Sequence, residues 1–273
     1  MPKIPLETGV SLHYLRDGDR GRDTVVLING LTMDTGAWEA VSERLAARFE
    51  VLRYDCRGQG QSDKPPGPYP PEQHADDLCA LLTTLKLGRV HLAGLSNGGL
   101  IAALTAGKLS GSGRIASLTM IDSFARSDAL FRALLRSWKA ALEQGGSALR
   151  FDVAVPWVWG PDFLDRHLQE VMALRAKAAA ADPAVIGALI DGLLGWSDAA
   201  ASLQSYRGPL LVMVGEDDVL SPIRYSREII ELAGRGRLEV IARSGHASPI
   251  ERPREVADLL GDFLEQYPPE VSA

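Results

Sequence analysis

Short aliphatic runs alternate with longer segments of helical periodicity along most of this chain. Near the start of the chain, the segment 11–17 alternates between apolar and polar residues and is expected to be an early antiparallel strand or hairpin. Apolar strands separated by helices form a mostly parallel sheet with helices on both faces, and such sheets bind ligands beyond the carboxyl ends of their strands. The sequence therefore predicts an α/β fold with a mostly parallel central sheet flanked by helices. Buried strands are expected at 24–29, 49–55, 89–95, 115–122, 209–215 and 237–242, and helices at 37–48, 72–87, 98–109, 223–233 and 253–266.

The interval 124–205 interrupts this alternation. It contains helical patterns such as "DALFRALLRSWKAALEQ" and "FLDRHLQEVMALRAKAAAA" but no convincing strand, and it holds four of the five tryptophans of the chain. We interpret it as a helical cap inserted into a core made of residues 1–123 and 206–273. The alternative is that these helices simply cover the sheet.

Composition limits the classes of function that remain. With 273 residues, 46% of them apolar, the chain is long enough for one large domain or one domain with an insertion. The net charge is −6 and no block of Lys and Arg occurs, which argues against nucleic acid as a partner. No window of about 18 apolar residues predicts a membrane span, and the start, "MPKIPLETGVSLHYL", shows no secretion signal. Cys56 and Cys79 lie outside any CxxC pattern, and the histidines show no metal-binding spacing, so we expect a cytoplasmic protein without a metal or cofactor.

A serine stands at a glycine-rich bend between an expected strand and an expected helix. The segment Gly94-Leu95-Ser96-Asn97-Gly98 fits the pattern G-x-S-x-G, which in this context presents a nucleophilic hydroxyl above the edge of the sheet. Glycines are needed there because neighbouring Cβ atoms would collide in so tight a turn. The alternative is a serine that caps the helix, with glycines that serve only close packing.

A nucleophilic serine needs a base, and the base needs a carboxylate. His246, in "ARSGHASPIERP", follows the last expected strand in a short turn, whereas histidines 13 and 91 fall in strand patterns and histidines 74 and 167 in helical patterns that suggest the surface. Asp218, in "VMVGEDDVLSP", follows the preceding strand, and its neighbour Asp217 should point the other way. Ser96, Asp218 and His246 are therefore the expected catalytic residues.

The order Ser-Asp-His and five segments of the chain resemble the α/β-hydrolase superfamily, over nearly the whole length. Up to about residue 110 the chain is similar to 3-oxoadipate enol-lactonase-like and related esterase-like members. The segments that carry the resemblance are "LINGLTMDTGAWEAV" (27–41), "VLRYDCRGQGQSDKPPGPY" (51–69), "LAGLSNGG" (92–99), "VGEDDVLSP" (214–222) and "SGHASPIERP" (244–253).

The resemblance implies an oxyanion hole made of two backbone amides, which fall on Leu31 and Asn97. Many members have His-Gly where this chain has Asn29-Gly30, a change that affects how the loop is braced rather than the amide itself. Some members carry the acid at the end of an earlier strand, where this chain has Asp122.

The expected activity is hydrolysis of a small or medium ester or lactone through an acyl-enzyme on Ser96. Trp157 and Trp159 lie in "VPWVWGP", where Pro and Gly bracket what is expected to be a short aromatic segment. We expect at least one of these indoles to face Ser96 in an apolar substrate pocket, although both could instead pack inside the cap. The same residues also suit a hydrolase of C–C bonds in β-diketone-like substrates or a cofactor-free perhydrolase, and a ligand receptor is a further alternative. The oligomeric state is not indicated.

Overall fold

The computed structural model describes residues 3–268, whose centre is an eight-stranded sheet with the strand order β1-β2-β4-β3-β5-β6-β7-β8. The first two strands run antiparallel to their neighbours and all other pairs are parallel, as the sequence predicts. The strand β1 is only three residues long and was not expected. The strands are β1 (Lys3–Pro5), β2 (Ser11–Asp17), β3 (Thr24–Ile28), β4 (Glu50–Tyr54), β5 (Val90–Leu95), β6 (Ile115–Ile121), β7 (Leu210–Gly215) and β8 (Arg237–Ile241).

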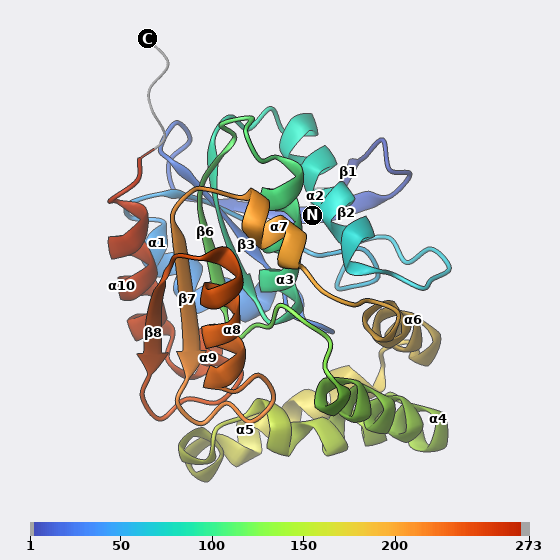
Figure 1. The fold of residues 1–273 in the computed structure, drawn as a ribbon. Helices are drawn as coiled ribbons and strands as arrows, with labels where there is room; N and C mark the ends of the chain where they lie inside the picture. Colours follow the sequence, from blue (N-terminus) through green and yellow to red (C-terminus); the bar gives the residue numbers. More distant parts are fainter. Residues whose placement is uncertain (1–2, 269–273) are drawn as a thin grey trace.

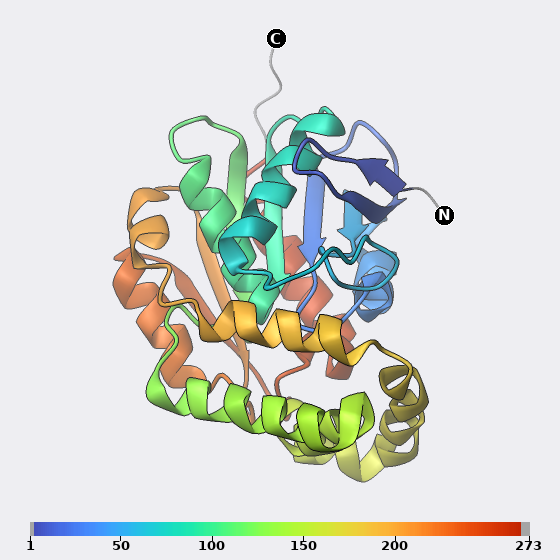
Figure 2. The same ribbon diagram turned by 90° about the vertical axis from the view of Figure 1, so that its right-hand side faces the viewer.

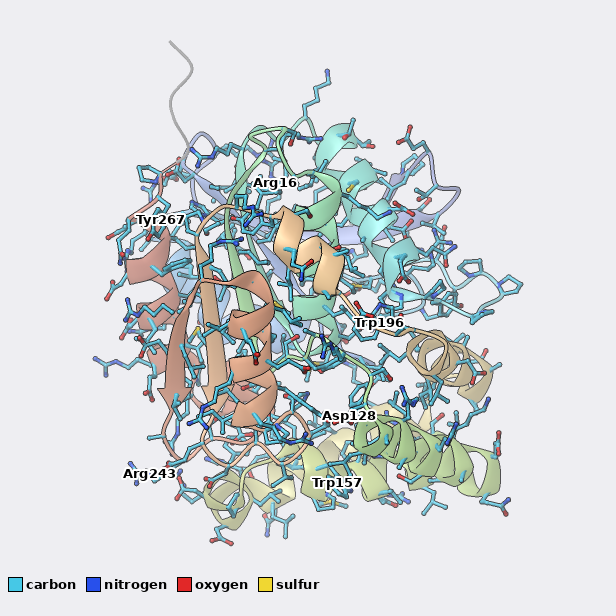
Figure 3. The ribbon with its side chains drawn as sticks, in the orientation of Figure 1. Arg16, Asp128, Trp157, Trp196, Arg243 and Tyr267 are labelled. Atoms are coloured by element: carbon cyan, nitrogen blue, oxygen red, sulfur yellow. The ribbon has the colours of Figure 1, made fainter. Side chains whose placement is uncertain are left out.

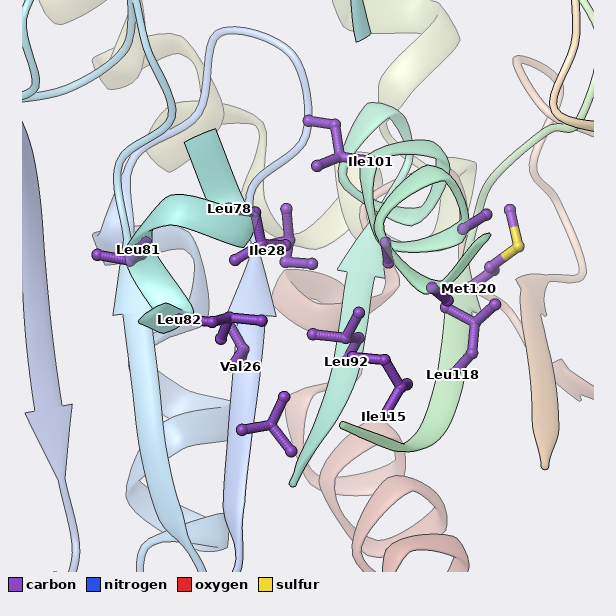
Figure 4. Packing of buried hydrophobic residues seen from close by; sticks show 14 of the residues in the cluster. Val26, Ile28, Leu78, Leu81, Leu82, Leu92, Ile101, Ile115, Leu118 and Met120 are labelled. Carbon is purple, nitrogen blue, oxygen red and sulfur yellow. The ribbon is translucent and has the colours of Figure 1, made fainter. Parts of the chain in front are cut away.

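Helices cover both faces of the sheet, and alternate residues of each strand point to opposite faces. Val25 and Leu27 of β3 belong to the core beneath α1 and α10, whereas Val26 and Ile28 belong to the core beneath α2 and α3 (Figure 4). Burying each of these side chains contributes about 1.5–3 kcal/mol. The helical elements are η1 (Thr35–Trp38), α1 (Glu39–Leu45), α2 (Pro71–Thr84), α3 (Asn97–Lys108), α4 (Ala129–Val158), α5 (Pro161–Ala179), α6 (Pro183–Leu194), α7 (Ala200–Ser205), α8 (Ile223–Ala233), α9 (Ser248–Glu251) and α10 (Pro253–Leu264).

Three long helices between β6 and β7 lie beyond the carboxyl ends of the strands (Figures 1 and 2). These are α4, α5 and α6, which we call the cap; the next helix, α7, packs against α3. The helix α4 bends at Gly145 and Gly146, where φ of Gly146 is 66° and only glycine adopts the conformation without strain. The division of the chain into a core and a cap insertion remains our proposal.

The two connections between the sheet and the cap run side by side. Arg126 and Asp198 form an antiparallel bridge. On either side of it, the amide of Ser127 donates to the carbonyl of Ser197 at 2.8 Å and the amide of Ala199 to the carbonyl of Ala125 at 2.9 Å. The chain therefore leaves for the cap and returns from it through one paired segment.

Two local expectations are wrong. The segment around Trp157 is the last turn of α4 rather than a separate non-helical stretch. Pro156 has no backbone N–H and so removes one hydrogen bond from α4. The helix tolerates this loss because it ends two residues later, at Val158. His74 is buried in α2, with 2% of its surface exposed, although its pattern suggested the surface. Among residues 3–268, none of the helices has the length and apolarity required to span a bilayer.

Candidate active site

Ser96 occupies a strained turn between β5 and α3. Its φ and ψ are 56° and −120°, a combination that non-glycine residues rarely adopt and that costs on the order of 1–3 kcal/mol. A Cβ atom at Gly94 would lie 2.1 Å from the carbonyl oxygen of Gly98, and one at Gly98 would lie 2.2 Å from that of Ile28. A side chain at either position would therefore collide with backbone atoms, so both positions require glycine. The Ser96 hydroxyl makes no capping bond to α3, so it is not a helix cap.

The structure brings together the three residues expected to be catalytic. Ser96 Oγ lies 2.8 Å from Nε2 of His246, and Nδ1 of His246 lies 2.9 Å from Oδ2 of Asp218. They follow β5, β8 and β7, whose carboxyl ends share one edge of the sheet because these strands are parallel. All three are buried, with at most 9% of their surface exposed. A hydroxyl, an imidazole and a carboxylate in this order can pass the serine proton to the imidazole.

The turn after β7 holds the carboxylate of Asp218 by three donors. Oδ1 accepts from the amides of Leu220, at 2.9 Å, and Ser221, at 2.8 Å, and Oδ2 accepts from the Ser221 hydroxyl at 2.7 Å. Asp217 is only partly buried, and its amide donates to the carbonyl of Ser244. Among the described residues, Asp218 rather than Asp217 contacts the His246 imidazole, and its role as the acid stays a prediction.

The pKa values of this pair move in opposite directions. Burial alone would raise the pKa of Asp218, but the charge and hydrogen bond of His246, together with the donors from Ser221, hold it below its usual value. Burial alone would lower the pKa of His246, but the charge and hydrogen bond of Asp218 raise it above the usual value. The pair thus favours a positive imidazole beside a negative carboxylate, which is the state that forms when a serine gives up its proton.

A second buried carboxylate, Asp122, directly follows β6. Among the hydrogen bonds of the described residues, none joins it to the imidazole of His246. Its oxygens accept from the amide of Gly215 at 2.8 Å and from the amide and hydroxyl of Ser248 at 2.9 and 3.0 Å. Burial and the nearby charge of Asp218 raise its pKa to about 8. Asp122 therefore links the end of β7 to the loop of His246 and does not occupy the position of the acid.

The two amides expected to form an oxyanion hole belong to Asn97, which directly follows Ser96, and to Leu31, which follows Gly30; a Cβ atom at Gly30 would lie 3.5 Å from Cβ of Ser96. Asn97 is the first residue of α3 and is buried, and Leu31 follows β3 and packs partly against the apolar cluster beneath the cap. Two side-chain amides hold the loop before Leu31 in place. Asn29 donates to the carbonyl of Tyr54 at 3.0 Å, and Gln59 donates to the carbonyl of Gly30 at 3.1 Å. The role of the two amides remains a proposal.

Glu251, which the sequence reasoning did not single out, joins the cap to the histidine loop. Its carboxylate accepts from the amide of Gly160, between α4 and α5, at 3.2 Å and from the amide of Gly245 at 2.9 Å. The amide of His246 also donates to the carbonyl of Val158 at 2.9 Å. The loop of His246 is therefore held by hydrogen bonds that involve the cap as well as the sheet. The only sequence signal is that a carboxylate follows His246 by five residues.

The two tryptophans expected in the pocket lie in different surroundings. Trp157 is 37% exposed on the cap (Figure 3). Trp159 is buried, stacks on Phe163 with ring centroids 5.2 Å apart, and packs in a cluster with Ala247, the residue after His246. Their place in a substrate pocket remains a prediction, for which Trp159 is the better positioned of the two.

This fold is that of the α/β-hydrolase family, to which the chain belongs: the model of the "Alpha/beta hydrolase family" matches residues 25–259. It is similar to a Caulobacter vibrioides protein provisionally named carbamate hydrolase RutD, with 27% identity over 97% of this chain and 99% of that protein. Two solved structures also resemble it. One is a malate-bound thermophilic esterase from Thermogutta terrifontis (27% identity, 97% and 98% covered, TM-score 0.86), and the other is the enol-lactonase from Burkholderia xenovorans (26%, 97% and 100%, TM-score 0.87).

Proposed function

We propose that this protein is a serine hydrolase that cleaves a small or medium carboxylic ester or lactone through an acyl-enzyme on Ser96. The observation that carries the proposal is the continuous contact from the serine hydroxyl through His246 to Asp218, at 2.8 and 2.9 Å. Membership of the α/β-hydrolase family supports it, as does similarity to an esterase and an enol-lactonase. In both kinds of substrate the scissile carbonyl carries an oxygen leaving group.

In the first half of the proposed reaction, Nε2 of His246 takes the proton of Ser96 while Oγ attacks the carbonyl carbon. The amides of Leu31 and Asn97 donate to the oxyanion, and loss of one such donor commonly costs about 2.7–4 kcal/mol of barrier. The imidazolium then gives its proton to the leaving oxygen, and the C–O bond breaks. The second half repeats these steps with water as the nucleophile, which releases the acid and restores Ser96.

Hydrolysis of p-nitrophenyl butyrate and of a simple lactone by the purified protein tests this proposal. We expect Ser96→Ala and His246→Ala to lower kcat at least 10³-fold with an unchanged thermal melt. Matched controls are Ser137→Ala in α4 and His167→Ala in α5, which should keep kcat within about twofold of wild type. An aryl phosphonate should label wild type once, on Ser96, and should not label Ser96→Ala.

Three results would overturn the proposal. Near-native kcat in Ser96→Ala would show that another nucleophile acts. Failure of every ester and lactone in a panel, together with turnover of a β-diketone or of acetate with hydrogen peroxide, would assign the same residues to C–C hydrolysis or perhydrolysis instead. Binding without any turnover would favour a receptor.

A further inference from the structure

A cap arginine is buried beside the oxyanion loop without an anionic partner. Arg150, in the second half of α4, has 7% of its surface exposed. Its Nη2 contacts only the hydroxyl of Thr32, at 3.3 Å, and its Nε has no hydrogen-bond partner among the described residues. A guanidinium carries five N–H donors and is almost never buried unless it is paired.

The charge of this group is uncompensated. Burial lowers the pKa of Arg150 to about 10, which still leaves the guanidinium protonated at neutral pH. Among residues 3–268, no carboxylate forms an ion pair with it. Arg57, another buried arginine, shows the usual arrangement: Asp77 accepts from its Nε and Nη2 at 2.8 and 2.6 Å. An unpaired buried charge is costly, and an anion from outside the chain would offset that cost.

The position of Arg150 shows where that anion would bind. Thr32 directly follows Leu31, so the guanidinium lies within about 10 Å of the amide proposed to hold the oxyanion, given the span of adjacent residues. On its other side lies the ring of Trp138, whose centroid is 6.0 Å from Cζ of Arg150 and whose Nε1 also lacks a partner among the described residues. Trp138 packs in the same apolar cluster as Leu31.

We propose that Arg150 binds a carboxylate of the substrate, so that the preferred substrates are esters or lactones that also carry a free acid group. The two oxygens of a carboxylate can accept two parallel hydrogen bonds from the planar guanidinium. They can also accept from the indole N–H of Trp138. The apolar wall around Leu31 then holds the short hydrocarbon segment between the acid and the reacting carbonyl. This inference rests on the proposed function, since it names the substrate class of the same site.

A pair of substrates that differ only in charge tests the inference. Monoethyl glutarate keeps one free carboxylate, and diethyl glutarate has none. We expect wild type to prefer the monoester, and Arg150→Gln to lower kcat/KM for the monoester about 10- to 100-fold, mainly through KM. The diester should stay within about twofold, and Arg150→Lys should recover part of the loss. The control Arg175→Gln removes an exposed cap arginine that is paired with Asp152, and it should not change the preference.

A binding measurement separates this inference from the proposed function. In Ser96→Ala, which cannot turn over an ester by the proposed route, glutarate should raise the melting temperature, and the further change Arg150→Gln should abolish that rise. If no ester is hydrolysed but glutarate binds through Arg150, the proposed function fails and the carboxylate site stands. Equal losses on the monoester and the diester in Arg150→Gln, or stabilisation by glutarate that persists without Arg150, would reduce Arg150 to a structural contact and overturn the inference.

Discussion

The hydroxyl of Ser221 touches both Asp218 and His246: its Oγ lies 2.7 Å from Oδ2 of the carboxylate and 3.0 Å from Nδ1 of the imidazole. A hydroxyl has one proton, and the carboxylate can only accept, so that proton points to Asp218. The N–H at Nδ1 of His246 is then shared between two acceptors, Oγ of Ser221 and Oδ2 of Asp218. This network places the imidazole proton on Nδ1 and leaves the lone pair of Nε2 facing Ser96.

Ser221 should therefore help to orient the base. We expect Ser221→Ala to lower kcat about 5- to 20-fold with little change in KM, because a net hydrogen bond to a charged group contributes about 1.5–3 kcal/mol and part of it acts in the transition state. Steady-state kinetics check this. Ser226→Ala, a buried serine of α8 whose hydroxyl has no partner among the described residues, is the matched control and should leave kcat unchanged. An unaltered kcat in Ser221→Ala would limit Ser221 to packing.

The choice of acid can be tested by three single changes. Asp218→Asn should lower kcat/KM by up to about 10⁴-fold, because the amide favours the wrong tautomer and removes the charge that stabilises the imidazolium. Asp217→Asn should be close to wild type. Asp122→Asn should fall far less than Asp218→Asn, since Asp122 contacts Ser248 and Gly215 rather than the imidazole. An inactive Asp122→Asn beside a fully active Asp218→Asn would move the acid to β6.

The pH profile follows from the raised pKa of His246. The base must be neutral to accept a proton, so activity rises as pH passes through this pKa. Because Asp218 shifts the pKa above the ordinary 6.5, the acid limb of kcat/KM should have its midpoint above 6.5. In Asp218→Asn the residual activity should have a lower midpoint than wild type. A wild-type midpoint at or below 6.5 would contradict the charge coupling between the two residues.

Contact between the cap and the histidine loop depends on a glycine in each. A Cβ atom at Gly160 would lie 2.6 Å from the amide nitrogen of Gly245. We expect Gly160→Ala to lower both kcat and the melting temperature, with a stability loss of about 1–3 kcal/mol from overpacking. Gly187→Ala in α6 is the control, because its Cβ would lie 3.7 Å from Leu142 of α4, which is an ordinary contact, and alanine favours a helix more than glycine does. Equal melts for the two variants would show that the cap moves freely away from the loop.

The sequence predicts this fold well wherever the signal is local. Apolar runs place seven strands to within about one or two residues at each end, and the glycines around Ser96 mark a turn that only such small residues permit. The spacing after β7 also distinguishes Asp218 from Asp217, because a single turn determines which side chain points inward.

Residues whose role depends on distant partners could not be found in this way. Arg150 looks like any cap arginine until the fold shows that it is buried and that its hydroxyl partner, Thr32, lies 118 positions away in the chain. Glu251 looks like a surface residue until Gly160, 91 positions away, is seen to donate to it. Burial of a charge is a property of the packed molecule, and periodicity in one helix does not report which elements close over it.

The paired connections at Ala125 and Ala199 have a consequence for how such a molecule diversifies. Because the chain departs and returns at one point, the three cap helices can be lengthened, shortened or exchanged without altering the register of any strand. Arg150 belongs to this exchangeable segment, whereas Ser96, Asp218 and His246 lie in the turns that follow β5, β7 and β8. Selection can therefore change which molecules are accepted, provided that each new cap keeps the contacts of Val158 and Gly160 with the loop of His246. A chimera that joins this sheet to another cap through the same two connections, with these contacts kept, should inherit the preferences of the protein that supplied the cap.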